Sequence, residues 1–215
     1  AFSRKYLDSD YGKTETWTVL GTRVIDGVEP YILFGFRPGV TYDSFYDCYL
    51  RQDVKGMIDS LNRVRVKRGD VFVIPGRVPH AIGSGVFLIE VQEPTDFVFQ
   101  LDKKGPCWDL SPFQVHMGLG DEKMFESFDF NAGDVLAQYQ SFFDFGNTPQ
   151  GVARLLPESL AGFFGASRVY VSDELEKENT CFTIGICIQG RGRCSTSAGG
   201  ITLKQGETFC IPACS

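Results

Sequence analysis

An eleven-residue pattern occurs twice in this chain and constrains its fold more than any other feature. The segment 66–76, VKRGDVFVIPG, matches the segment 203–213, LKQGETFCIPA, without a gap and 137 residues away. Each copy places a glycine and an acidic residue before a short apolar run that ends in Ile-Pro. This separation is far too long for a solenoid of short repeats, so we expect two domains of one architecture.

The first copy opens a longer segment, residues 66–96, whose pattern predicts strand, turn and strand. Residues 71–74 are apolar and mostly β-branched, Pro75-Gly76 indicates a turn, and residues 86–92 alternate as a half-buried strand does. His80, one of only two histidines, falls between the two runs. We therefore expect a buried imidazole that faces the space enclosed by the strands.

The remaining pattern favours a mainly β protein with helical segments. Phe and Gly are abundant, at 19 and 24 residues, which suits a turn-rich β protein better than a helical bundle. Apolar residues at three- and four-residue steps between 41 and 61 predict one or two helices, capped at Thr41 or Asp43. Residues 2–7 are expected to end a helix, and residues 11–20 to enter a strand through a glycine turn. Further strands are expected at 28–36, 167–171, 182–188 and 192–196; helices at 122–128 and 134–142; and a loop at 101–123.

Composition excludes several classes of function. The chain has 27 acidic and 21 basic side chains and no basic cluster, which argues against a nucleic-acid partner. No apolar run approaches the ~20 residues needed to cross a bilayer, and the first residues, AFSRKY, do not form a signal peptide. We expect a soluble cytoplasmic protein, with no membrane partner and an oligomeric state that the sequence leaves open. Because the chain begins at Ala1 and stops just after a strand-like run, we also expect further residues at both ends.

The cysteine pattern indicates free thiols. The seven cysteines are odd in number and form no CxxC pair, and most lie inside apolar strand-like runs. Free, buried thiols in a reducing cytoplasm are expected, in preference to a disulfide framework or a zinc knuckle. Cys210 and Cys214 are the pair whose spacing leaves the alternative open.

The repeated pattern resembles the cupin double-stranded β-helix, a jelly-roll barrel, in which the Gly-acidic turn reverses the chain at the rim and the Pro ends a strand. The resemblance sharpens to the class I phosphomannose isomerases and covers nearly the whole chain. The motifs that carry it are YGKTETW at 11–17, GDVFVIPGRVPHAIGSG at 69–85, IEVQEPTD at 89–96 and MGLGDEKMF at 117–125. It implies a metal-bearing N-terminal cupin at 1–102 with a helical insert at about 41–62, a connector at 103–162, and the start of a second cupin at 163–215.

The resemblance also implies a zinc site. In that family one zinc is held by the Gln and His of a Gln-x-His-Pro motif, by the Glu of a Lys-x-Glu motif and by the His before Ala. Carried over, Glu15 and His80 are metal ligands, and the other two are expected upstream of Ala1. Such a site leaves a position for water or a sugar hydroxyl. The letters Gln114-Val115-His116 lie beyond the EPTD strand, so we do not expect His116 to be a ligand.

Three further residues are candidates for the catalytic site. Lys13 lies two residues before Glu15, so on a strand both side chains would share one face; the alternative is a surface lysine. Glu90 stands in an apolar run, where a buried carboxylate must be paired, hydrogen-bonded or functional; the alternative is an outward-facing position. Gln100 occupies the position where the family commonly carries an Arg. Glutamine cannot supply a positive charge, so this departure bears on rate, phosphate recognition or both.

The function implied by the resemblance is that of an aldose-ketose isomerase. It would interconvert mannose 6-phosphate and fructose 6-phosphate through an enediol intermediate, with a small sugar phosphate as its partner. A non-catalytic sugar-binding or regulatory cupin that has lost the Arg at position 100 is the alternative. A metal-dependent oxygenase on the same barrel would need a two-His facial site, and the GKTE motif speaks against it.

Overall fold

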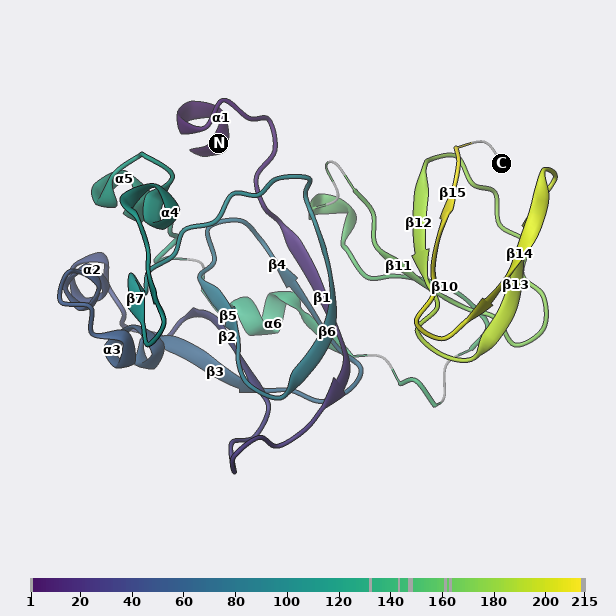
Figure 1. Ribbon diagram of the computed structural model, residues 1–215, viewed down its shortest axis with the longest axis horizontal. Coiled ribbons are helices and arrows are strands. Elements are labelled where there is room, and N and C mark those ends of the chain that lie inside the picture. The colour runs from purple at the N-terminus through teal and green to yellow at the C-terminus, as the bar shows by residue number, and fades with distance from the viewer. Residues whose placement is uncertain are drawn as a thin grey trace. The chain divides into compact units, whose positions relative to one another are not determined.

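Figure 1 shows the computed structural model of the protein, which describes residues 2–131, 133–142, 144–146, 149–160, 162 and 164–213. Strands dominate, which confirms the mainly β fold class. The chain forms two compact units, Ala1–Thr148 with Val152–Arg168, and Pro149–Gly151 with Val169–Ser215. The domains expected at 1–102, 103–162 and 163–215 remain predictions.

The first unit is built on two antiparallel sheets. One has the order β6-β1-β4-β9, from β1 (Glu15–Thr22), β4 (Asp70–Ile74), β6 (Val86–Gln92) and β9 (Gln140–Phe142). The other has the order β3-β2-β5, from β2 (Tyr31–Phe36), β3 (Leu61–Arg65) and β5 (His80–Ile82). Both sheets contribute to one apolar core, which contains Trp17, Val19, Ile32, Phe34, Val66, Phe72, Ile74, Val78 and Val135. All five residues of β4 are buried, as its apolar run predicted.

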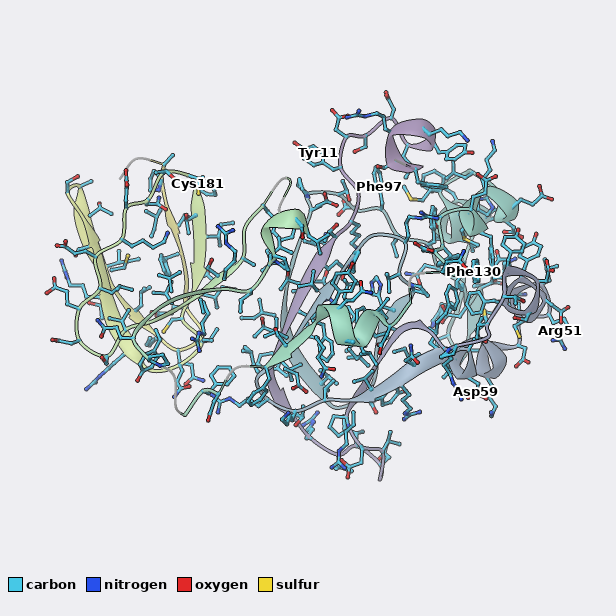
Figure 2. All side chains as sticks on the ribbon, turned by 180° about the vertical axis from the view of Figure 1, so that it is seen from behind. Tyr11, Arg51, Asp59, Phe97, Phe130 and Cys181 are labelled. Carbon is cyan, nitrogen blue, oxygen red and sulfur yellow. The ribbon has the colours of Figure 1, made fainter. Side chains whose placement is uncertain are left out.

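In the part of the chain that the structure describes, six short helices accompany these sheets. The insert after β2 forms two helices, as expected, and Thr41 caps the first: its hydroxyl accepts a hydrogen bond from the Ser44 amide in a capping box. A separate aromatic cluster joins the insert to later helices, and in it Phe36 stacks on Phe130, which Figure 2 labels, at 4.4 Å between ring centroids. The helices are α1 (Phe2–Tyr6), α2 (Tyr42–Leu50), α3 (Val54–Asp59), α4 (Pro112–His116), α5 (Asp121–Phe125) and α6 (Val135–Tyr139).

The repeated sequence forms the same turn in both units. In the first copy the Asp70 carboxylate accepts a hydrogen bond from the Lys67 amide at 2.8 Å, and in the second Glu207 accepts one from the Lys204 amide at 2.9 Å. The glycine before each acidic residue has a positive φ, 99° and 89°, a conformation that suits glycine. The strand after each turn then pairs antiparallel with an earlier strand of its own unit.

The remaining strands form two-stranded sheets. In the second unit, β12 (Thr183–Ile186) pairs with β15 (Thr208–Ile211), and β13 (Arg191–Thr196) pairs with β14 (Gly199–Lys204). Two other pairs join β7 (Lys104–Gly105) to β8 (Trp108–Asp109), and β10 (Gly151–Arg154) to β11 (Ser167–Tyr170); a 3-10 turn, η1, spans Glu158–Leu160.

Two expectations about local structure were wrong, and one strand was not foreseen. Residues 101–123 are not a loop, because they contain β7, β8, α4 and the start of α5. The helix expected at 134–142 ends at Tyr139, because the next three residues extend the sheet beside β4. Residues 11–20 enter a strand as expected, and it begins at Glu15, where pairing with β4 and β6 begins. Finally, β3 was not foreseen, because its short alternating run follows the helical insert directly.

The cysteines are free but not buried. The six that lie among the described residues, Cys48, Cys107, Cys181, Cys187, Cys194 and Cys210, form no disulfide, and each is half-buried or exposed. The expectation of free thiols is confirmed for these six, and the expectation that they are buried is wrong. Cys214, and hence its pairing with Cys210, falls outside the described residues.

Among the residues that the structure describes, no helix has the length and apolar character required for a membrane span.

Candidate metal centre

Glu15 places a carboxylate inside the first unit. It opens β1, the strand held between β4 and β6, where it pairs with Ile74 on one side and Gln92 on the other. The residue is only 2% exposed. Because side chains alternate along a strand, Glu15 shares a face with Trp17 and Val19, both members of the apolar core. A buried carboxylate among such neighbours requires polar partners.

His80 supplies the nearest of these partners. It begins β5 and pairs with Phe34 of β2 in the other sheet. Its Nδ1 lies 2.7 Å from the Val78 carbonyl oxygen, and since a carbonyl only accepts, Nδ1 donates this hydrogen bond. The other ring nitrogen, Nε2, lies 3.5 Å from Glu15 Oε2. The side chain is 28% exposed, so the expected imidazole is present but only partly buried.

The segment that leads into His80 is held at both ends of its turn. The Arg77 guanidinium donates hydrogen bonds to the carbonyls of Ser127 and Phe128, at 3.0 and 3.2 Å. The carbonyl of Pro79 accepts a hydrogen bond from the Gly35 amide at 2.8 Å. These contacts connect the histidine to β2 and to the residues after α5. Nothing in the sequence pattern marked Arg77 for this role.

Lys13 and Glu90 both reach the same carboxylate environment. Lys13 lies just before β1 rather than on it, yet its Nζ is 3.5 Å from Glu15 Oε1. Glu90 pairs with Trp17 across β6 and β1, and although the residue is exposed, its Oε2 accepts the indole N–H at 3.0 Å. The same indole N–H lies 2.9 Å from Glu15 Oε2. The structure therefore brings four of the expected residues together, and adds Trp17.

The electrostatic balance at Glu15 favours the ionised form. Burial by itself raises the pKa of this carboxyl, because a charge is poorly solvated in the interior. The hydrogen bond and charge of His80, the charge of Lys13 and the indole hydrogen bond outweigh burial, and the net pKa lies below its usual value of 4.5. Glu15 is therefore a carboxylate at neutral pH, as a metal ligand must be.

Two other residues considered from the sequence lie apart from this group in their contacts. Gln100 is exposed, and its backbone amide donates to the carbonyl of Val115 at 3.0 Å. His116 ends α4, and its Nδ1 accepts a hydrogen bond from the Gly120 amide at 3.1 Å. This contact closes the turn between two helices, and the expectation that His116 is no ligand stays a prediction.

The donors present suit a zinc ion as part of its ligand set. The Nε2 of His80 lies beside the ionised Glu15 carboxylate, and zinc binds both imidazole nitrogen and carboxylate oxygen. Among the described residues, however, no group of three or more His, Cys, Asp or Glu side chains is placed to hold a metal. Glu15 and His80 could thus supply two ligands, and a tetrahedral site needs others.

The second unit differs at the matching position. In the first unit the residue opposite the last residue of β4, Ile74, is Glu15. The matching residue of β15, Ile211, lies opposite Thr183, whose hydroxyl donates to the Asn179 side chain at 2.8 Å. The two units share a turn but not a buried carboxylate.

Comparisons with known proteins agree with this geometry. No protein-family model matches the chain. Mannose-6-phosphate isomerase of Streptococcus mutans is 28% identical over 106 residues, which is 45% of this chain and 29% of that protein. Mannose-6-phosphate isomerase ManA of Bacillus subtilis is 27% identical over 106 residues, 46% of this chain and 29% of that protein. The chain is similar to the phosphomannose isomerases.

Solved structures extend the similarity to nearly the whole fold. The mannose 6-phosphate isomerase of Bacillus subtilis superposes with a TM-score of 0.70 at 19% identity, over 99% of this chain and 62% of that one. A mutant phosphomannose isomerase of Salmonella typhimurium gives 0.53 at 14% identity, over 94% and 61%. The resemblance expected from the motifs is confirmed, and a cupin fold fits these phosphomannose isomerase neighbours. The chain spans less than two thirds of the length of each protein it matches.

Proposed function

We propose that the protein is a zinc-dependent aldose-ketose isomerase that interconverts mannose 6-phosphate and fructose 6-phosphate. The observation that carries the proposal is the convergence of Lys13, Glu15, His80 and Glu90, which meet around the Glu15 carboxylate and the Trp17 indole of the first unit. The names of the similar proteins support the same reaction and the same sugar phosphate. A soluble, cytoplasmic location remains part of this proposal.

Each residue has a role in the proposed reaction. Glu15 and His80 would provide two zinc ligands, and zinc held there would supply Lewis-acid polarisation of the sugar oxygens. Lys13 is an ammonium paired with Glu15, so it stabilises negative charge as the enediol forms. That leaves Glu90, whose residue is open to solvent, as our candidate for the base that moves a proton between C2 and C1.

An assay of the purified, zinc-loaded protein tests the proposal. We expect interconversion of the two sugar phosphates, and a loss of at least about 100-fold in kcat for Glu90→Gln, since general base catalysis contributes ~10²–10⁴-fold. Glu207→Gln is the control. This glutamate lies in the second unit, in the turn that repeats the Lys67–Asp70 turn, so its substitution should leave activity unchanged. Failure with both the sugar phosphates and unphosphorylated mannose would reject the isomerase.

A sugar-binding or regulatory cupin is the second candidate, and Gln100 favours it. The side chain at this position is uncharged and the residue is exposed, so it supplies no cation to an enediolate or a phosphate. Gln100→Arg separates the two functions. A large gain in turnover supports an enzyme that the glutamine has slowed, whereas sugar binding without turnover in either form supports the binding protein.

A further inference from the structure

One indole N–H connects the two carboxylates of the site. Trp17 Nε1 lies 2.9 Å from Glu15 Oε2 and 3.0 Å from Glu90 Oε2, so a single donor serves both side chains. The two glutamates come from neighbouring strands, and Trp17 and Glu90 are direct partners in the register of β1 and β6. No separate loop or helix is needed to bring the three groups together.

In this contact the indole is always the donor and the carboxylates are always the acceptors. An indole N–H only donates and never ionises, so it can hold both carboxylates as their hydrogen-bond donor but can act neither as a metal ligand nor as a base. Two carboxylates that share one donor repel each other, and the donor offsets part of this repulsion. Without it, each side chain is free to rotate toward other partners.

The indole itself is held firmly. Trp17 is 2% exposed, belongs to the apolar core, and meets the His80 ring edge-on at 5.3 Å between centroids. Its ring therefore cannot swing away from the carboxylates without disturbing the core. A donor that is fixed in the core in this way also fixes the positions of the Glu15 and Glu90 carboxylates, which it hydrogen-bonds.

We propose that Trp17 is a positioning residue that holds Glu15 and Glu90 in one fixed arrangement. Through Glu15 it sets the affinity of the site for zinc, and through Glu90 it sets the placing of the proposed base. The inference rests on the proposed function. It adds to it a residue that touches neither metal nor substrate.

The first test compares two matched substitutions, because the chain has two tryptophans. Trp17→Phe keeps an aromatic ring in the core but removes the N–H, and Trp108→Phe makes the same change at a residue of β8 that is 43% exposed. Zinc affinity is measured by competition with a chromophoric chelator. We expect Trp17→Phe to weaken zinc binding ~10- to 100-fold and Trp108→Phe to leave it unchanged, in line with other residues that orient metal ligands.

A second test needs no substitution at Trp17. In Trp108→Phe protein the indole N–H signal of Trp17 is the only one in a ¹⁵N-¹H correlation spectrum. We expect it to lie downfield, to exchange slowly with solvent, and to move upfield in both Glu15→Gln and Glu90→Gln. This measurement remains decisive if Trp17→Phe fails to fold, which circular dichroism will reveal.

The outcomes separate this inference from the proposed function. Equal zinc affinity of folded Trp17→Phe and Trp108→Phe proteins overturns the inference alone, as does an indole signal that neither glutamate substitution moves. A parent protein that binds no zinc overturns the inference and the metal-dependent isomerase together. Reduced zinc affinity in Trp17→Phe, in a parent that lacks isomerase activity, supports the positioning role and rejects the reaction.

Discussion

Glu15 shows how a buried charge is maintained by specific partners. Desolvation opposes its ionisation, while His80, Lys13 and the Trp17 indole favour it, and the balance lowers the pKa of the carboxyl. The three partners come from the start of β5, from the residues before β1 and from β1 itself. The protonation state of Glu15 therefore depends on how the sheet that contains β1 packs against the sheet that contains β5.

The lowered pKa of Glu15 predicts a pH dependence of stability. A group whose pKa is lower in the folded protein stabilises the fold above its unfolded pKa, and that contribution is lost as the pH falls through the folded pKa. Urea unfolding of the metal-free protein should therefore show a smaller free energy of unfolding at pH 3.5 than at pH 6. The decline should be smaller in Glu15→Gln, which has no carboxyl to titrate there. An equal decline in both proteins would contradict the assignment.

Thr16 offers a site for stabilisation on the other face of β1. It is 2% exposed, and within the described part of the chain its hydroxyl has no hydrogen-bond partner. It pairs with Val73, which packs on Leu156 and Ala166. Thr16→Val keeps the shape and removes the unpaired polar atom, so we expect a gain of about 1 kcal/mol in the free energy of unfolding.

The matched control for Thr16→Val is Thr95→Val. The Thr95 hydroxyl donates to the Gly12 carbonyl, so the same substitution should destabilise the protein there. Urea unfolding at pH 7 measures both changes. A loss of stability in Thr16→Val would show that its hydroxyl has a favourable interaction.

At the scale of elements, the turn between β4 and β5 determines where His80 lies. Arg77 within this turn has a φ of 80°, a left-handed conformation that is costly for a residue with a side chain. Its guanidinium hydrogen bonds to the residues after α5 are the compensating interaction. The left-handed backbone and the guanidinium hydrogen bonds both belong to Arg77. Substitutions that remove the side chain with or without keeping a Cβ can therefore measure the two effects separately.

We predict that Arg77→Ala destabilises the protein by about 1–3 kcal/mol, because it loses the anchor and keeps the strain. Arg77→Gly loses the same hydrogen bonds but relieves the left-handed φ, so it should be more stable than Arg77→Ala by about 1 kcal/mol. Chemical unfolding of the three proteins measures this order. If Gly were no better than Ala, the strain at residue 77 would be rejected.

At the scale of the molecule, the repeated turn is not accompanied by a repeated carboxylate. The Gly-acidic turn is the same in both units, but Thr183 stands where the first unit has Glu15. A threonine hydroxyl bonded to Asn179 is a neutral group and a poor match for zinc. The turn serves the fold in both units, and the carboxylate serves one of them.

This difference predicts a zinc stoichiometry of one per chain. Glu15→Gln should abolish tight binding, because it removes the charged ligand, whereas Thr183→Ala should leave both affinity and stoichiometry unchanged. Isothermal titration with zinc measures both quantities. Two sites per chain, or a loss of binding in Thr183→Ala, would contradict the assignment of the metal to the first unit.

The sequence by itself determined the features that depend on neighbouring residues. The repeated turn could be predicted because a Gly-acidic pair before an apolar strand defines its own hydrogen bonds, and the Thr41 cap and the two insert helices follow from local spacing in the same way. The motifs around Glu15 and His80 also identified the residues that now lie 3.5 Å apart, and the phosphomannose isomerase fold that carries them.

Only the tertiary structure decided which residues complete the site. The bridge from Trp17 to Glu90 depends on the register between β1 and β6, and the anchor at Arg77 depends on residues 50 positions away. Local sequence does not encode such pairings, because they depend on how distant segments pack together in the folded unit. The same reason explains why residues 140–142, which continue a helical pattern, end as a strand beside β4.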